Sequence, residues 1–136
     1  FLIHYHPLDL LHLKTSFETV IGKLEDNSSL PLIPAKSIKQ LIRINFEKNR
    51  ESYMFFKIKS TFKQNNVSQY EEKSKGYTIV SCGLGTQFDF LNNPMKFNLA
   101  ITNLTNKLYV DHLSRLKSDG IYNIGRNITL GFNYNF

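Results

Sequence analysis

The residues that decide the fold read Asn127-Ile128-Thr129-Leu130-Gly131-Phe132-Asn133-Tyr134-Asn135-Phe136. An apolar side chain stands at every second position, and a small or polar side chain stands at each position between. Successive side chains of a β-strand point to opposite faces, so this period of two predicts a strand with one apolar and one polar face. A helix would need apolar residues at intervals of three and four.

The same alternation recurs through the chain, and it predicts an all-β fold. We expect six strands of about ten residues each, at 11–21, 38–47, 53–62, 77–90, 97–104 and 127–136, and a seventh at 1–5 that ends before the turn signal at Pro7. The apolar faces upstream of residue 127 are then formed by Leu11, Leu13, Phe17, Ile21, Ile38, Ile42, Ile44, Phe46, Met54, Phe56, Ile58, Phe62, Val80, Cys82, Leu84, Phe88, Phe97, Leu99 and Ile101.

The predicted connections alternate between short and long. Residues 48–52 and 91–96 form short turns, the second containing Asn-Asn-Pro, whereas 22–36, 63–76 and 105–126 form long loops. In a sheet whose strands run up and down in order, this alternation places every tight turn at one end and every long loop at the other. Transmembrane β-barrels have this asymmetry.

Charged side chains fall on the polar faces of the predicted strands. Those on the faces just described are Lys14, Glu18, Lys39, Arg43, Glu47, Lys57, Lys59 and Asp89. A Lys or Arg that faces lipid at the bilayer midplane costs about 2–4 kcal/mol, so their exclusion is expected of a barrel in a membrane. A soluble β-sandwich also keeps charge off its apolar face, so this observation leaves both architectures open.

Aromatic residues are concentrated where the strands meet the short turns. The set comprises Phe46, Tyr53, Phe88, Phe90, Phe97, Tyr134 and Phe136. Such a concentration predicts a girdle of rings at a membrane interface.

Composition narrows the function classes. The net charge of +6 is spread from Lys14 to Arg126, which is typical of a solvated surface and argues against nucleic-acid binding. Cys82 is the single cysteine, so no intrachain disulfide is possible, and no apolar stretch is long enough for a spanning helix. Because the sequence begins Phe-Leu-Ile-His with no Met and no signal region, we expect it to be a piece of a longer chain.

The final strand resembles that of bacterial outer-membrane proteins, where it is the insertion signal for the barrel-assembly machinery; its residues here are Ile128, Leu130, Phe132, Tyr134 and Phe136. The last predicted hairpin resembles that of TonB-dependent receptors. This resemblance rests on two segments, Asn103-Leu104-Thr105-Asn106-Lys107-Leu108-Tyr109 and Gly125-Arg126-Asn127-Ile128. The segments Pro7-Leu8-Asp9 and Leu30-Pro31-Leu32-Ile33-Pro34-Ala35 fit the same family.

The resemblance implies an antiparallel, up-and-down transmembrane β-barrel segment, with six or seven strands of a larger, 22-stranded barrel. Residues 1–136 would be the C-terminal part of an outer-membrane barrel, without the plug domain, since seven strands cannot close in lipid with bare edges. The missing strands and plug would come from the rest of the protein or from another chain. Implied partners are outer-membrane lipid and lipopolysaccharide, the barrel-assembly machinery, and a TonB-type energy-coupling protein that acts through the absent N-terminal part.

The implied function is import of a scarce, bulky solute, such as a ferric siderophore, haem or another metal complex, across the bacterial outer membrane. This chain would supply wall and extracellular loops. The alternative is a small outer-membrane or soluble β-barrel that does not transport and binds an anionic partner. We expect no enzyme, because neither a nucleophile elbow nor an ordered triad spacing is present, and no cofactor.

Two groups of side chains are candidate sites. His4, His6 and His12 lack the carboxylate or cysteine partners of a metal site, and we expect them to be turn and lumen residues. The loop at 105–126 holds a set able to stack on and pair with an anionic ligand: Tyr109, Asp111, His112, Arg115, Lys117, Asp119 and Tyr122. The other interpretation is a solvated loop that packs on its neighbours or faces lipopolysaccharide. The inward cations Lys14, Lys39, Arg43, Lys57 and Lys59 would pair with Glu18, Glu47 or plug residues.

Overall fold

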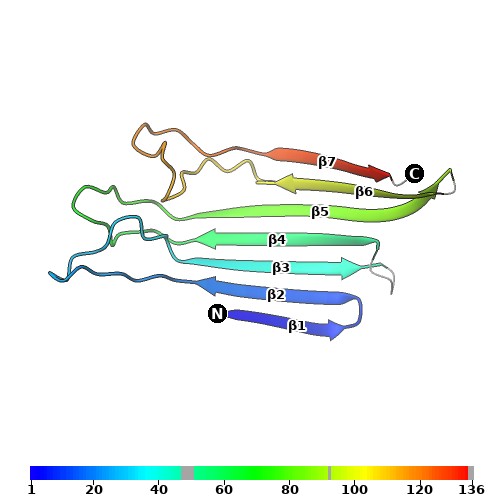
Figure 1. Cartoon of the computed structure of the whole chain (residues 1–136), viewed down its shortest axis with the longest axis horizontal. Helices are drawn as coiled ribbons and strands as arrows, with labels where there is room; N and C mark the ends of the chain where they lie inside the picture. Colours follow the sequence, from blue (N-terminus) through cyan, green and yellow to red (C-terminus); the bar gives the residue numbers. More distant parts are fainter. Residues whose placement is uncertain (47–50, 92, 135–136) are drawn as a thin grey trace.

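A computed structural model of the chain describes residues 1–46, 51–91 and 93–134. These residues form one antiparallel sheet of seven strands, each paired with its neighbours in the sequence (Figure 1). The strands are β1 (Leu2–Leu8), β2 (Leu11–Glu18), β3 (Ser37–Asn45), β4 (Tyr53–Thr61), β5 (Tyr77–Phe90), β6 (Asn93–Thr102) and β7 (Asn127–Tyr134). The predicted all-β fold class and the up-and-down order are confirmed. No helix long and apolar enough to cross a membrane occurs among the described residues.

The register places the predicted apolar residues in continuous rows across one face, which we call the outer face. One row crosses all seven strands and contains Tyr5, Leu13, Ile42, Phe56, Cys82, Ile101 and Ile128. The next row contains Leu11, Ile44, Met54, Leu84, Leu99 and Leu130. A shift of one residue in any strand would send its apolar side chains to the other face, so these unbroken rows specify the pairing.

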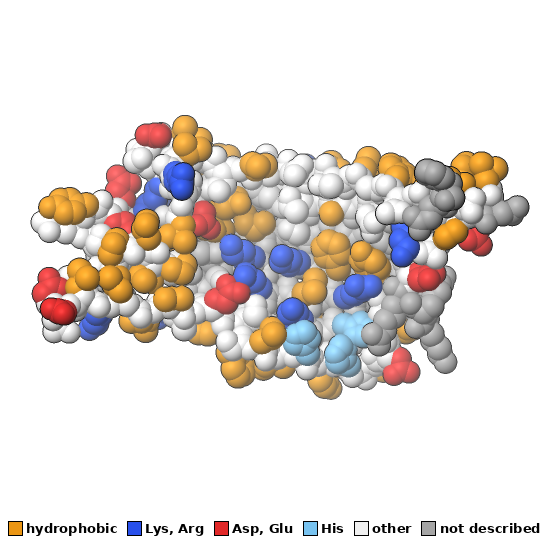
Figure 2. All heavy atoms as spheres, in the orientation of Figure 1, with side chains coloured by type: hydrophobic (Ala, Val, Ile, Leu, Met, Phe, Trp, Pro, Cys, Tyr) orange, Lys and Arg blue, Asp and Glu red, His pale blue; other side chains and the backbone are white. Residues whose placement is uncertain are grey.

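The opposite face, which we call the inner face, carries the polar and charged residues. One of its rows contains His4, Lys14, Leu41, Lys57 and Ser81, and another contains His12, Arg43, Phe55, Gly83, Ala100 and Thr129. Figure 2 views this face, where Lys and Arg side chains gather over the middle strands with histidines beside them. All charges predicted for the polar faces and described by the structure, from Lys14 to Asp89, therefore share one side.

The described residues of the sheet do not enclose an apolar interior. Tyr77 is the only buried apolar side chain among the described residues, whereas Phe132 is 65% exposed, Ile128 59% and Ile44 39%. The accessible surface of 9964 Å² exceeds the roughly 7,300 Å² expected for a folded monomer of 15.8 kDa. A soluble sandwich would bury these residues against a second sheet. The described residues supply no such sheet.

The connections follow the predicted alternation. Long loops at 19–36, 62–76 and 103–126 lie at one end of the sheet, and the short connections lie at the other (Figure 1). One predicted turn is wrong in length, because β5 and β6 pair as far as Phe90 opposite Asn93, so the connection is 91–92 rather than 91–96. Pro94 lies within β6, where it stands opposite Asp89 of β5. The predicted turn at 48–52 lies largely outside the described residues.

β1 and the aromatic girdle also differ from expectation. β1 continues past Pro7 to Leu8, with an irregularity in pairing between Tyr5 and Leu8 that accommodates the proline. Tyr53 does not belong to the girdle, since it lies on the inner face opposite Asn45 and Gly85. Among the other predicted rings, Phe46, Phe88, Phe90 and Tyr134 are exposed at the short-turn end, Phe97 is half-buried on the outer face, and Phe136 lies outside the described residues.

β5 extends beyond its neighbours. Its first nine residues, Tyr77 to Gly85, pair with the whole of β4, whereas Cys82 to Phe90 pair with β6. The β5–β6 hairpin therefore projects past the short-turn end of β4.

Candidate functional site

The loop at 103–126 is anchored at its base by side-chain hydrogen bonds to backbone groups. The amide of Asn103 donates to the carbonyl of Lys107 (2.9 Å) and accepts from its N–H (2.8 Å), and Asn103 is 2% exposed. The N–H of Arg126 donates to Oδ1 of Asn106 (2.9 Å), and its guanidinium donates to the carbonyl of Leu104 (3.0 Å). These contacts give a physical reason for the presence of Asn103, Asn106 and Arg126 in the two segments of the last hairpin that were singled out from the sequence. They close the two ends of the loop on each other.

The loop then folds over the inner face through Asp111. The hydroxyl of Tyr77 donates to Oδ2 of Asp111 (2.5 Å), and the rings of Tyr77 and Tyr109 lie 4.4 Å apart. Tyr77 stands opposite Thr61 on the inner face and is 7% exposed. Asp111 and Tyr109 are thus held above the lumen side of the sheet rather than above its outer face.

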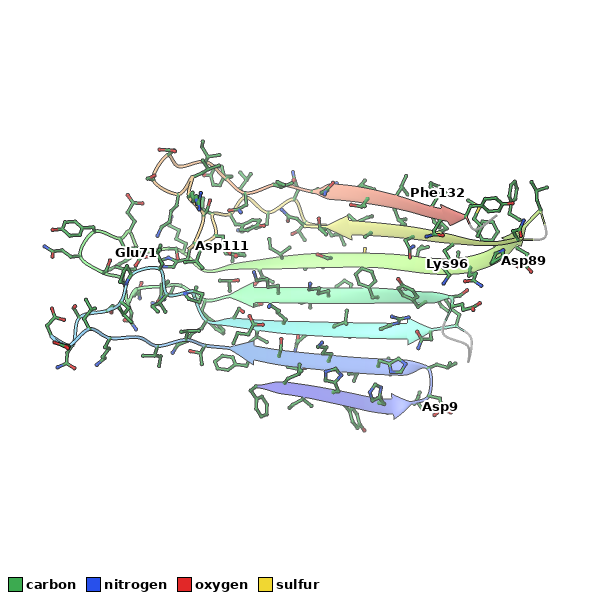
Figure 3. All side chains as sticks on the ribbon, in the orientation of Figure 1. Asp9, Glu71, Asp89, Lys96, Asp111 and Phe132 are labelled. Atoms are coloured by element: carbon green, nitrogen blue, oxygen red, sulfur yellow. The ribbon has the colours of Figure 1, made fainter. Side chains whose placement is uncertain are left out.

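His112 joins this loop to the loop at 62–76. Its Nδ1 lies 3.0 Å from Oγ of Ser74 and 3.2 Å from Nζ of Lys117, and its Nε2 lies 3.0 Å from Oε1 of Glu71. Lys117 can only donate, so Nδ1 accepts and the ring proton sits on Nε2. Nε2 makes no hydrogen bond of standard geometry among the described residues, so its approach to Glu71 is a close polar contact. Lys117 also donates to the carbonyl of Glu72. Figure 3 shows Glu71 and Asp111 at the same end of the sheet.

The charges in this junction, which we call the loop junction, shift two pKa values. Burial and the positive charge of Lys117 lower the pKa of His112, against an opposing effect of Glu71. Burial alone would raise the pKa of Asp111. The hydrogen bonds from Tyr77 and from the N–H of Leu113 outweigh this effect, so the pKa of Asp111 is lowered. At neutral pH the junction therefore contains a neutral imidazole and an ionised carboxylate.

Acidification is expected to loosen the loop junction. The pKa of His112 lies below its ordinary value of 6.5 when the loop is docked, so the undocked loop binds the proton more readily. Docking is complete above pH 6.5 and weakens as the pH falls below it, with a second loss below 3.8 as Asp111 is protonated. We expect amide hydrogen exchange in 103–126, corrected for intrinsic rates, to be faster at pH 5.5 than at pH 7.5. The variant His112→Gln should lose most of that difference, and equal protection of the wild type at both pH values would contradict the prediction.

Next to the loop junction is a cleft of about 380 Å³ between the two loops. Its lining includes four cations and three aromatic rings: Lys73, Lys75, Lys107, Lys117, Tyr77, Tyr109 and Tyr122. Among the described residues that line it, Glu72 is the only acidic one. The cleft therefore combines positive charge with ring surfaces, as a site for an anion would.

The structure divides the predicted loop residues into three groups. Tyr109, Lys117 and Tyr122 line the cleft, whereas Asp111 and His112 are engaged in holding the loops together. Arg115 and Asp119 are exposed and lie outside the cleft lining. That these residues bind a ligand stays a prediction, and for Asp111 and His112 the packing interpretation has the support of their contacts.

The prediction missed the residues contributed by the loop at 62–76, which are Glu71, Lys73, Ser74 and Lys75. A signal was available, because the alternation of long and short connections already placed 63–76 and 105–126 at the same end. Only β5 and β6 separate them in the strand order. Their meeting was therefore predictable, although the pairing of side chains was not.

Of the inner-face cations expected to pair with Glu18, Glu47 or plug residues, Lys39 forms an ion pair with Glu18 at 2.6 Å. Glu47 lies outside the described residues. Arg43 donates to Oδ1 of Asn45 (2.9 Å) and stacks on the ring of Tyr53, 3.8 Å from its centre. These contacts satisfy polar groups of the wall itself.

The three histidines also lie on or near this face. His4 stands opposite Lys14, and the rings of His6 and His12 meet edge to face through their Nδ1 atoms, 4.6 Å between centres. Nε2 of His12 lies 2.7 Å from Nδ2 of Asn45. Among the described residues, no three or more His, Cys, Asp or Glu side chains are grouped to hold a metal ion. That the chain holds no metal stays a prediction.

Comparison with known proteins gives a structural match without a sequence family. No protein-family model and no curated protein matches the chain. Among solved structures, the chain is similar to one described as "Copper transporter OprC", with a TM-score of 0.84 at 18% sequence identity. The alignment covers 98% of this chain and 22% of the transporter chain. At this level of identity the match shows the fold: nearly all of this chain has the architecture of a segment that makes up about a fifth of a transporter.

Proposed function

We propose that this chain forms wall and extracellular loops of an energy-coupled β-barrel receptor that imports a scarce, bulky solute across the bacterial outer membrane. The observation that carries the proposal is the two-faced sheet: apolar rows cover its outer face, and all described strand charges share its inner face. Such a sheet is stable where hydrocarbon covers one side and water or polar groups cover the other.

Two further observations support a larger barrel. In the described residues β1 and β7 do not contact each other, so each presents an edge with unpaired backbone groups. Such edges are costly in lipid, and strands from the rest of the protein or from another chain would satisfy them. On the resemblance of the last hairpin, the chain is the C-terminal part of a 22-stranded barrel with a plug and a TonB-type coupling protein. In this role it has no catalysis of its own.

The insertion signal fits the same proposal. Ile128, Leu130, Phe132 and Tyr134 all lie on the outer face of β7, each more than a third exposed. Phe136 lies outside the described residues. The barrel-assembly machinery, lipid and lipopolysaccharide are the partners that this proposal assigns to β7 and the outer face.

The solute class is a metal complex, such as a ferric siderophore or haem. The name of the structural neighbour supports transport of a metal, and the basic cleft supports a ligand that brings its own negative groups.

Deletion of the gene tests the proposal. We expect cells lacking the intact protein to take up less of one metal during limitation, measured as cell-associated metal by mass spectrometry across iron, copper, zinc and cobalt. Complementation with the wild-type gene should restore uptake. Unchanged uptake of all four metals and of haem under limitation would refute the transport function, and recovery of the protein as a soluble, monodisperse species would refute its place in the membrane.

A further inference from the structure

The three long loops lie at one end of the sheet, and the loop at 62–76 is the middle one (Figure 1). It joins β4 to β5, whereas the loop at 19–36 joins β2 to β3 and the loop at 103–126 joins β6 to β7. We call the latter two the flanking loops. Among the described residues, hydrogen bonds and close polar contacts join each flanking loop to the middle loop, and none joins the flanking loops to each other.

The middle loop is a small hairpin whose base contacts both flanking loops. Gln64 and Ser74 pair through two backbone hydrogen bonds, of 3.0 and 3.1 Å. The side-chain amide of Gln64, which is 9% exposed, donates to the carbonyl of Ile33 in the loop at 19–36 (3.1 Å). The hydroxyl of Ser74 lies 3.0 Å from Nδ1 of His112 in the loop at 103–126. One backbone pair therefore carries side chains that hold both neighbours.

A single carboxyl oxygen of the same hairpin also reaches both flanking loops. Oε1 of Glu71 accepts a hydrogen bond from the N–H of Leu32 (3.3 Å) and lies 3.0 Å from Nε2 of His112. Its other oxygen accepts from the N–H of Ser68 (3.4 Å), which fixes the side chain on its own loop. The side chains of His112 and Glu71 are 1% and 12% exposed, so water has little access to their contact. Loss of Glu71 would leave polar groups of two loops without this partner.

The backbone of Leu32 supports a holding role for Glu71. Its φ of 58° lies in the left-handed region, which a residue other than glycine adopts at a cost. The side chain of Leu32 is 71% exposed, so its packing does not offset that cost. A strained backbone persists where surrounding contacts hold it, and the hydrogen bond to Glu71 is such a contact. This part of the loop at 19–36 should therefore be released when Glu71 is lost.

We propose that Glu71 couples the three long loops, so that they dock on the sheet and leave it as one unit rather than one at a time. Coupling requires a shared element whose state both sites affect. Here that element is the hairpin at 62–76. Undocking of 103–126 removes the contact at His112 and loosens the hairpin that holds Leu32. The inference concerns the loops themselves and does not depend on the proposed import function.

Amide hydrogen exchange read by mass spectrometry tests the coupling, on the intact gene product in detergent micelles at pH 7.5. The variant Glu71→Ala removes the shared oxygen. The control Glu72→Ala removes the same chemical group from the next residue, whose side chain is exposed and whose backbone carbonyl accepts from Lys117. The variant His112→Ala removes the contact from the other flanking loop and leaves the hydrogen bond between Leu32 and Glu71 in place.

We expect Glu71→Ala to speed exchange by about two- to tenfold at 30–33 and at 108–114, the change that loss of one ordinary hydrogen bond makes in a local opening equilibrium. Glu72→Ala should change it by less than about 1.5-fold. The decisive result is faster exchange at 30–33 in His112→Ala, a variant that alters nothing in contact with that segment.

An unchanged rate at 30–33 in His112→Ala, or an effect of Glu71→Ala confined to one flanking loop, would overturn the inference. The amides that pair β5 with β6 should keep their protection in every variant, which shows that the sheet is folded. Because the two variants alter different loops, either one tests the coupling if the other does not fold.

Discussion

Leu130→Arg is expected to destabilise the folded barrel by about 2–4 kcal/mol, whereas Thr129→Arg is expected to change its stability by less than about 1 kcal/mol. The two residues are neighbours in the middle of β7, and both are exposed. Leu130 stands opposite Leu99 on the outer face, and Thr129 stands opposite Ala100 on the inner face. An Arg at Leu130 would have to enter hydrocarbon, and an Arg at Thr129 would face water or polar groups.

The measurement is the free energy of unfolding in lipid vesicles, followed by the shift in gel mobility between folded and heat-unfolded barrel. The pair is matched in strand, depth and added charge, so only the face differs. Equal destabilisation by both variants would contradict the assignment of lipid to the outer face. Retention of full stability by Leu130→Arg would contradict it directly.

Gly83→Ala is expected to cost about 1–3 kcal/mol, and Gly131→Ala less than about 0.5 kcal/mol. A Cβ at Gly83 would lie 2.5 Å from the ring of Phe55 and 2.6 Å from the backbone carbonyl oxygen of Leu99. The ring can rotate away, but the carbonyl belongs to the β5–β6 ladder. At Gly131 the nearest atom is Cβ of Asn98 at 3.8 Å, an ordinary contact.

Denaturant titration of the two variants in vesicles would measure these costs. The double variant Gly83→Ala/Phe55→Ala separates the two clashes, because removal of the ring relieves only the first. We expect it to remain less stable than Phe55→Ala alone. An effect of Gly83→Ala no larger than that of Gly131→Ala would show that the close approach of β5 and β6 tolerates a methyl group.

The faces of the strands were predictable from sequence because side-chain direction depends only on a period of two. Leu13, Phe56 and Ile128 come from strands far apart in the chain, yet they fall in one row as the alternation requires. The same period of two places Tyr53 on the inner face, because an even number of residues separates it from Lys57 and from Lys59. Its predicted place in the girdle is therefore wrong.

Strand ends and loop contacts were less predictable. Proline marks a turn when its missing N–H would break a ladder, but Pro7 lies where the pairing of β1 with β2 is irregular, and Pro94 lies inside β6 opposite Asp89. The contact of His112 with Ser74 depends on the path of two long loops, which no periodicity specifies. Sequence therefore indicated which loops meet, and only the structure shows which side chains hold them.

The projection of β5 and β6 past β4 has a geometric consequence. Gly85 is the last residue of β5 that pairs with β4, and pairing with β6 continues to Phe90, about 16 Å farther at about 3.3 Å per residue. The part of the sheet built by β5 and β6 therefore reaches farther at the short-turn end than the part built by β3 and β4, which ends at Asn45 opposite Tyr53. If the sheet closes into a cylinder, its rim at that end is higher at β5 and β6 than at β3 and β4.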